Sequence, residues 1–264
     1  MNAQMRATGF SNPNADIASK RSGQVRKYIK ITAALLGLGL AATAGYALYK
    51  IHYSHPGRFS SEVTTEGLKR IVEGTTLTSQ EHPAARITFP PEYRYLGAQR
   101  FILYGTVEAE QYFFASAHPD GSTKSLINVQ FEAILPEIKG TYDYSAAPRA
   151  VTIGPLDFFV DADPVRRHWL VPNGLPGTDS ERYYSFTDEH GFPLPKNYIW
   201  SRFAYVPKDA PRQEMLILQA EDLAPKGLTA SALRQGGANA KEWEGLLNAH
   251  LEVLEQAITI EPLR

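Results

Sequence analysis

Residues 125–135 read SLINVQFEAIL, and this stretch decides the fold of the larger part of the chain. Apolar and polar residues alternate along it, with Ile127, Val129, Phe131 and Ala133 in one set and Asn128, Gln130 and Glu132 in the other. Successive side chains of a β-strand point to opposite faces of a sheet, so this alternation predicts a strand. We expect its apolar face to lie in a core and its polar face to be wet.

Further strands are predicted on both sides of this one. They cover residues 101–107, 110–117, 150–153, 156–160, 198–206 and 213–220, with turn residues between them. The tetrapeptide His118-Pro119-Asp120-Gly121 is a strong turn signal just before residues 125–135. Helical segments do not alternate with the strands, which argues against a doubly wound fold and its nucleotide-binding crevice.

The C-terminal segment predicts an amphipathic helix. Asn239 and Glu242, three residues apart, resemble a capping box at its start. A mostly apolar stripe with helical spacing follows, at Trp243, Leu246, Leu247, His250, Leu251, Leu254 and Ile258. Such a stripe needs a sheet to cover, so we expect the α+β class, with a strongly bent antiparallel β-sheet packed by this helix. A partly closed barrel is the alternative.

Two other segments complete the predicted domain. Residues 65–73 predict a short helix, because Thr64 or Thr65 can cap it and Gly74 follows its end. Residues 164–195 are rich in Pro and Gly and predict an irregular excursion over the surface. Long loops are uncommon without a role, so this excursion is the expected place for binding.

The N-terminal region predicts a membrane anchor. Residues 31–49 carry no charge, and Lys30 and Lys50 bound them. A helix of this length covers most of a hydrocarbon layer about 30 Å thick. Residues 16–30 carry five basic side chains before the span, whereas only Lys50 and Arg58 follow it closely. This excess of basic residues on the N-terminal side predicts a cytoplasmic N-terminus.

We therefore expect a basic, disordered cytoplasmic tail at residues 1–30, a transmembrane helix at residues 31–50 and a β-rich extracytoplasmic domain at residues 51–264. The protein is then a single-pass protein of the cell inner membrane with a periplasmic C-terminal domain. A cleaved signal peptide is the rival interpretation, because Ala42-Thr43-Ala44 resembles a cleavage site, and a mitochondrial presequence is a third. Small residues recur every four positions in the span and favour helix association in lipid, at Ala33, Gly37, Ala41 and Gly45.

Charge is distributed unevenly along the chain. Residues 1–30 carry six basic side chains and one acidic side chain, whereas residues 51–264 carry 20 basic and 27 acidic ones. The tail is attracted to anionic lipids, and the acidic body argues against nucleic acid as a partner. The chain has no Cys, which excludes thiol chemistry and Cys-ligated zinc.

Two polar clusters are candidates for ligand binding. The first comprises Asp157, Asp161, Asp163, Arg166, Arg167 and His168. Its acids could ligate calcium, but the spacing lacks a Gly-centred loop, and local ion pairs with the arginines are the simpler interpretation. The second is Tyr142-Asp143-Tyr144, whose rings could line a sugar or peptide groove, although Asp143 ahead of Ala147-Pro148 also favours a plain turn.

The chain lacks the motifs His-Glu-x-x-His, Gly-x-Ser-x-Gly, Gly-x-x-x-x-Gly-Lys and Gly-x-Gly-x-x-Gly. We therefore expect no metal and no cofactor, and we place a non-enzymatic role ahead of an enzymatic one. The first hypothesis is a membrane-anchored envelope protein that binds a protein partner or a second copy of itself, or that assists assembly of a membrane complex. The second is a binder of a small apolar ligand in a cavity between the sheet and the Trp243 helix, lined by Phe113 and Phe131. The third is a hydrolase acting on exported substrate.

Overall fold

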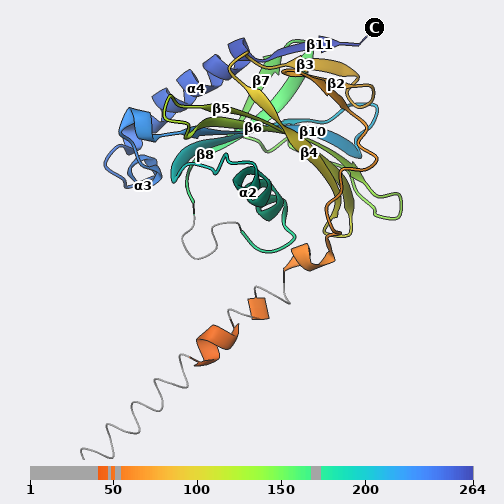
Figure 1. The fold of residues 1–264 in the computed structure, drawn as a ribbon, viewed down its shortest axis with the longest axis horizontal. Helices are drawn as coiled ribbons and strands as arrows, with labels where there is room; N and C mark the ends of the chain where they lie inside the picture. The colour runs from red at the N-terminus through yellow and green to blue at the C-terminus, as the bar shows by residue number, and fades with distance from the viewer. Residues whose placement is uncertain (1–40, 47–48, 51–54, 168–173, 264) are drawn as a thin grey trace, which may run out of the picture. The chain divides into compact units, whose positions relative to one another are not determined.

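The computed structural model describes residues 41–46, 49–50, 55–167 and 174–263, and Figure 1 shows their fold. The chain divides into two units, Met1–Ser54 and His55–Arg264. Every strand that the structure describes belongs to the second unit. The second unit is therefore the β-rich part that the sequence predicts.

Most of the predicted membrane anchor lies outside the described residues. Residues 41–46 and 49–50, which include Ala41 and Gly45, are helical, whereas Ala33 and Gly37 are not described. Within the described part of the chain, every helix is too short or too polar to cross a bilayer. The anchor, its orientation and its association ridge therefore stay predictions.

A seven-stranded antiparallel sheet forms the centre of the second unit. Its strand order is β4-β5-β6-β10-β9-β8-β7, so the sheet is open, with β4 and β7 as its edges. The strands are β4 (Arg94–Leu103), β5 (Val107–Ala117), β6 (Thr123–Ile134), β7 (Arg149–Ile153), β8 (Leu156–Arg166), β9 (Asn197–Tyr205) and β10 (Gln213–Asp222). Strand β6 contains the alternating stretch and pairs with both β5 and β10, which confirms the prediction of a strand there.

A smaller antiparallel sheet has the strand order β1-β2-β3-β11. Its strands are β1 (Ile71–Glu73), β2 (Thr76–Ser79), β3 (Ala85–Thr88) and β11 (Thr259–Pro262). Strand β11 pairs with β3, so the C-terminal strand of the unit lies beside one of its first strands. The small sheet thus joins the two ends of the unit.

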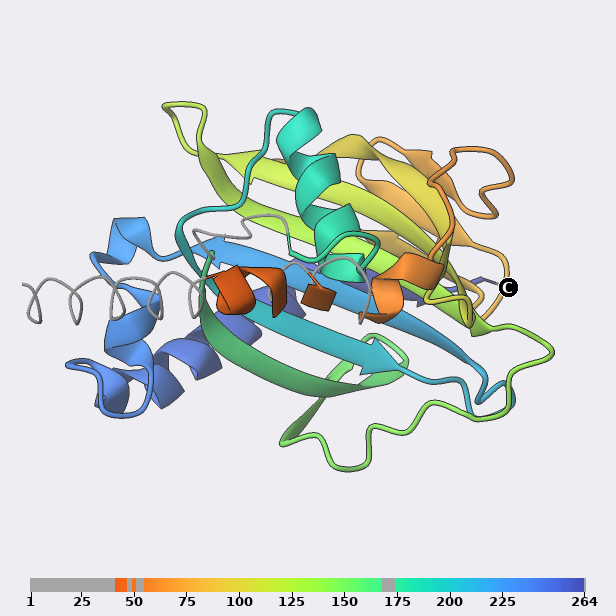
Figure 2. The same cartoon turned by 90° about the horizontal axis from the view of Figure 1, so that it is seen from below.

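Two α-helices lie on opposite faces of the seven-stranded sheet, as Figures 1 and 2 show. Helix α4 (Trp243–Ala257) packs on the face that the small sheet also covers, and α2 (Asp179–Glu189) lies across the other face. We name these the α4 face and the α2 face. The remaining described elements are α3 (Ala230–Leu233) and the 3-10 turns η1 (Pro56–Phe59), η2 (Ala224–Lys226) and η3 (Ala240–Glu242).

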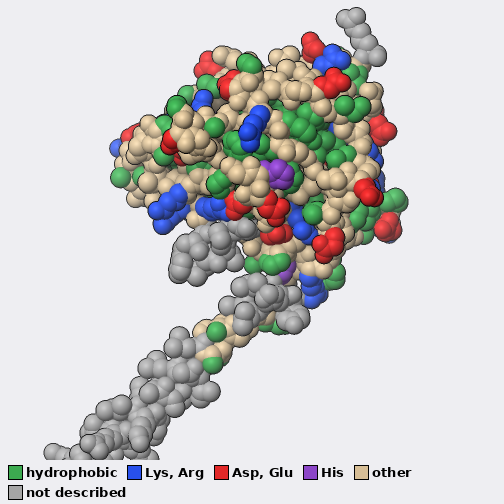
Figure 3. Space-filling view, in the orientation of Figure 1, with side chains coloured by type: hydrophobic (Ala, Val, Ile, Leu, Met, Phe, Trp, Pro, Cys, Tyr) green, Lys and Arg blue, Asp and Glu red, His purple; other side chains and the backbone are tan. Residues whose placement is uncertain are grey.

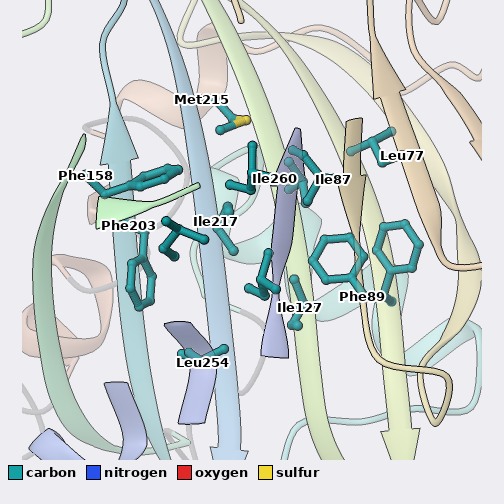
Figure 4. Close-up of a cluster of buried hydrophobic side chains, with 14 of the residues drawn as sticks. Leu77, Ile87, Phe89, Ile127, Phe158, Phe203, Met215, Ile217, Leu254 and Ile260 are labelled. Atoms are coloured by element: carbon teal, nitrogen blue, oxygen red, sulfur yellow. The ribbon is translucent and has the colours of Figure 1, made fainter. Parts of the chain in front are cut away.

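The main hydrophobic core lies between the α4 face and the layer formed by the small sheet and α4. Figure 4 shows side chains from all three gathered there, among them Ile217 of β10, Ile87 of β3 and Leu254 of α4. These three are at most 2% exposed. Burial of one such side chain stabilises the fold by about 1.5–3 kcal/mol, so this core stabilises the packing of the small sheet and of α4 on the seven-stranded sheet.

The α+β class and the C-terminal helix are confirmed, and two antiparallel sheets replace the single bent sheet. The buried residues of α4 belong to the predicted stripe: Leu247, His250, Leu251 and Leu254. The start of the helix differs from the expected capping box. Asn239 Nδ2 donates to Glu242 Oε1 over 2.7 Å, and the helix begins only at Trp243, after η3.

Three local predictions are wrong. Residues 65–73 form no helix, because their apolar end pairs with β2 as strand β1. Residues 101–107 span the end of β4 and the start of β5, since Tyr104 and Gly105 adopt positive φ angles of 54° and 67° in a tight turn. Residues 164–195 contain the 11-residue helix α2, whereas the sequence predicted an irregular segment there.

Candidate functional site

Three glutamines form a row across the α2 face. Gln99 of β4, Gln111 of β5 and Gln130 of β6 lie opposite one another in the strand register. Gln99 Nε2 donates to Gln111 Oε1, and Gln111 Nε2 donates to Gln130 Oε1, each over 2.6 Å. Gln111 and Gln130 have no exposed surface. The expected wet face of β6 is therefore wrong at Gln130, which is covered and bonded within the protein.

The glutamine row ends at a pair of carboxyl groups. Glu132 of β6 and Glu214 of β10 lie directly opposite each other in the antiparallel register, and their carboxyl groups form a hydrogen bond. Gln130 Nε2 also donates to Glu132 Oε1. Two tyrosine hydroxyls complete the cluster, because Tyr142 donates to Glu132 Oε2 over 2.9 Å and Tyr144 donates to Glu214 Oε2 over 2.6 Å.

This carboxyl pair favours a bound proton at neutral pH. Burial raises the pKa of both carboxyl groups above the ordinary 4.5, and repulsion by Glu132 helps to raise the pKa of Glu214 to about 9. The positive charge of Arg202 opposes the rise at Glu214 without cancelling it. We therefore place a proton on Glu214, which donates to the Glu132 carboxyl group.

A cavity of about 300 Å³ lies beside the glutamine row, lined by both the α2 face and α2. Its aromatic lining is Tyr183 and Tyr184 of α2 with Tyr198 and Trp200 of β9. Its volume is that of about ten water molecules in the liquid. Few polar groups and several aromatic ones around a cavity of this size are typical of a small-molecule site.

The remaining lining residues connect the cavity to the glutamine row. Leu216 and Leu218 come from β10, and Gln111 and Gln130 belong to the row itself. Leu216 lies opposite Gln130, one position along the same face from the pair formed by Glu214 and Glu132. The carboxyl pair is therefore next to the cavity without lining it.

Helix α2 is held over the cavity by a cap and by ring stacking. Thr178 Oγ1 accepts a hydrogen bond from the Glu181 N–H over 3.2 Å and begins the helix. The Phe186 ring stacks on Phe113 of β5 with 4.1 Å between centroids. Gly97 of β4 has a φ of 142°, and a Cβ at this position would lie 3.1 Å from the Phe186 ring. Glycine at this bulge thus lets α2 approach the sheet closely.

Charged groups also reach the cavity. Arg202 donates to Asp161 of β8 through Nε over 3.2 Å and through Nη2 over 2.5 Å. Asp179, the first residue of α2, accepts a hydrogen bond from the Tyr104 hydroxyl over 3.3 Å. Burial, together with the charge of Asp179, raises the pKa of Tyr104 to about 12. In Figure 3, acidic side chains gather where Figure 1 shows α2. The sequence of α2 contains four acidic residues and one Arg.

The first predicted polar cluster divides between ion pairs and solvent. Asp161 lies at the cavity only through its bond to Arg202, which lines it. Asp157 accepts a hydrogen bond from the Thr152 hydroxyl over 2.8 Å, and Asp163 is exposed. The structure therefore does not bring the three acids together around one ligand.

The basic members of that cluster have other partners. Arg167 Nη2 lies 2.6 Å from Asp188 Oδ2 of α2, and its guanidinium lies over the Tyr184 ring. Arg166 is exposed, and His168 lies outside the described residues. Asp161 and Arg167 each form an ion pair with a residue distant in sequence, whereas the simpler interpretation of this cluster predicts local pairs.

The second predicted cluster is split between a turn and the carboxyl pair. Asp143 is exposed and accepts a hydrogen bond from the Ser145 N–H over 2.9 Å, as expected for a turn. Tyr142 and Tyr144, on either side of it, turn inward to the carboxyl pair. Burial and the nearby carboxyl groups raise the pKa of both tyrosines, so both stay neutral donors. Binding of a ligand by these tyrosines stays a prediction.

A second constellation has the connectivity of a catalytic triad. Ser201 Oγ lies 3.1 Å from His250 Nε2, and His250 Nδ1 lies 2.8 Å from Glu221 Oε2. A nucleophile must reach its substrate, but Ser201 has no exposed surface and His250 is 5% exposed. Burial alone would raise the pKa of Glu221, yet hydrogen bonds from His250 and Lys226 outweigh it and lower this pKa to about 2. These residues form a buried link between β9, β10 and α4.

Sequence reasoning missed the glutamine row and the carboxyl pair. A signal for them existed, because Gln130 and Glu132 recur on one face of a predicted strand and Glu214 is the second residue of another. Pairing of Glu132 with Glu214 follows from the register of β6 and β10, which brings together two residues 82 positions apart in sequence. The sequence contains no local feature that determines this register.

No cluster of three or more metal-ligating side chains occurs among the residues that the structure describes. No protein-family model, curated protein or solved structure matches this chain. Function must therefore be argued from the chemistry of the site itself.

Proposed function

We propose that the unit His55–Arg264 is a binding domain that takes a small organic molecule into the cavity beneath α2. The predicted anchor at residues 31–50 would tether this domain to a membrane. In this proposal, α2 and the α2 face form the two walls of the site, and the glutamine row supplies its hydrogen-bonding groups. The proposal keeps the ligand-binding hypothesis but moves its site to the opposite face of the sheet.

The observation that carries the proposal is the aromatic and polar lining of the cavity beneath α2. The space beneath α4 holds the main core, including Phe131, whereas Phe113 belongs to a separate cluster with α2. The expectation that these two phenylalanines line one cavity is therefore wrong. The cavity of about 300 Å³ lies beneath α2 and combines four aromatic rings with a few polar groups.

Two other hypotheses have less support. A serine hydrolase would need an accessible nucleophile, and Ser201 is fully buried. Binding of a protein partner stays a prediction from the sequence, because it draws on the anchor and on the segment of residues 164–195 rather than on any described contact.

The proposal can be tested by filling the cavity. A fragment library is screened against the full-length protein by ligand-observed NMR, and the hits are repeated on Leu218→Trp, in which a larger side chain occupies the cavity. We expect Leu218→Trp to lose the hits that the wild type binds.

The matched control is Val253→Trp, which adds the same side chain at a position of α4 that is 63% exposed. This variant should bind the same fragments as the wild type, and thermal unfolding should show that both variants fold. Equal binding by Leu218→Trp, or an absence of hits on the wild type, would contradict the proposal.

A further inference from the structure

We infer that the ligand of this cavity is an organic cation, an amine whose apolar body lies among the aromatic rings and whose ammonium group lies at the Asp179 end. The inference rests on the proposed function and names the chemical class of its ligand. Three features of the site point to it: the balance of charge, a buried hydroxyl without a partner and the nature of its walls.

The balance of charge at the cavity is negative. Arg202 is the cationic residue of the lining, and two hydrogen bonds to Asp161 already neutralise it. Asp179 also lines the cavity, and within the described residues it accepts hydrogen bonds but forms no ion pair. A cation entering the cavity would therefore meet net attraction, and an anion would meet net repulsion.

The hydrogen bonds around the cavity leave one buried hydroxyl for a ligand. Gln111 Oε1 accepts from Gln99, and Gln130 Oε1 accepts from Gln111 and Asn128, so the amide oxygens of the row are already engaged. Tyr183 lines the cavity and is 7% exposed, and its buried hydroxyl has no partner among the described residues. A buried polar atom without a partner is costly. An ammonium group brings three donors, and the Tyr183 hydroxyl oxygen can accept one of them.

The aromatic walls are suited to positive charge. Guanidinium groups already lie over two of the four rings, with Arg202 5.8 Å from the Trp200 centroid and Arg167 5.3 Å from the Tyr184 centroid. Aromatic faces attract cations through the ring quadrupole, and this attraction strengthens where water is excluded. The acid-rich α2 would add long-range attraction for a cation approaching from solvent.

The test compares three probes of one size that differ in charge. Tyramine carries an ammonium group, 4-(2-hydroxyethyl)phenol carries a neutral hydroxyl in its place, and 4-hydroxyphenylacetate carries a carboxylate. Binding of each to the full-length protein is measured by isothermal titration calorimetry at neutral pH. We expect tyramine to bind about tenfold more tightly than the neutral probe, and the anionic probe to bind more weakly than both.

A variant pair assigns the preference to the cavity. Asp179→Asn should reduce the affinity for tyramine about tenfold and leave the affinity for the neutral probe unchanged. Asp143→Asn removes an equivalent charge from an exposed turn and should change neither affinity. Thermal unfolding confirms that both variants fold.

The outcomes separate this inference from the proposed function. Equal binding of all three probes, with loss of all binding in Leu218→Trp, would overturn the cation inference and leave the binding domain supported. Preference for the anionic probe would also overturn the inference. Failure of all three probes to bind would overturn the inference, and the fragment screen would then decide the proposed function separately.

Discussion

The α4 face and the α2 face belong to the same seven strands, but they carry different side chains. On the α4 face, residues such as Phe203 and Ile217 have no exposed surface and are packed by the small sheet and α4. On the α2 face, the glutamine row and the carboxyl pair are buried beside a cavity. Because side chains alternate along a strand, one face of the sheet can form the core that stabilises the fold. The other face can then carry buried polar groups beside a cavity, which lowers stability.

The largest expected effect is the loss of a ring from the packed face. Phe203→Ala should lower the free energy of unfolding by about 3–5 kcal/mol, because it leaves a cavity in a filled core. Trp200→Ala, on the same strand but facing the cavity, should cost only about 1–2 kcal/mol. Urea denaturation measures both. Equal losses would mean that the two faces are packed alike.

The next effect is a dependence of stability on pH that comes from the α2 face. The pKa of Glu214 is about 9 in the folded protein and near the ordinary 4.5 in the unfolded chain. Between these two pH values the folded protein therefore binds a proton at Glu214 that the unfolded chain has released. Stability should therefore fall as pH rises from about 4.5 to about 9, with a slope of at most about 1.4 kcal/mol per pH unit from this group.

Glu214→Gln tests this dependence. Glutamine can still donate to Glu132 but does not titrate, so the slope should become shallower, while Tyr144, Arg202 and Asp179 are unchanged. Urea denaturation from pH 5 to pH 9 provides the measurement. The same slope in both proteins would contradict a proton shared by the carboxyl pair.

A smaller effect is expected from the buried link on the α4 face. His250→Ala should cost about 1–3 kcal/mol, because Ser201 and Glu221 lose their partner. Gln256→Ala, on an exposed position of the same helix, is the control and should cost close to nothing.

The pH dependence of this link has the opposite sign. Because the pKa of Glu221 is lowered to about 2, its contribution is present above about 4.5 and is lost as pH falls towards 2. The stability difference between the wild type and His250→Ala should therefore shrink in acid, and a difference that grows there would count against this assignment.

The smallest effect concerns the cap of α2. Thr178→Ala should lower stability by about 1 kcal/mol, and Thr178→Ser should restore most of it, because the hydroxyl accepts the Glu181 N–H. Amide hydrogen exchange in α2 should be faster in Thr178→Ala than in the wild type, whereas exchange in α4 should be unchanged. Faster exchange in both helices would show that the two faces are not independent.

Local sequence patterns predicted the elements that depend on local chemistry. The alternation in residues 125–135, the turn at His118-Pro119-Asp120-Gly121 and the apolar stripe of α4 each correspond to a described element. Helix α2 was missed because Pro and Gly surround it, yet Thr178 and Gly191 are ordinary start and stop signals. A helix of 11 residues is marginal alone, and it depends on contacts such as that of Phe186 with Phe113.

The order of residues along β6 was enough to show which of them share a face, because side chains alternate along any strand. It also determined the charge of each segment and the uncharged stretch at residues 31–49. Three outcomes could not be predicted in this way: α2 covers the polar face of β6, Glu132 lies opposite Glu214, and the buried Ser201 contacts His250. These outcomes depend on strand register and on contacts between residues far apart in the chain, which no local pattern encodes.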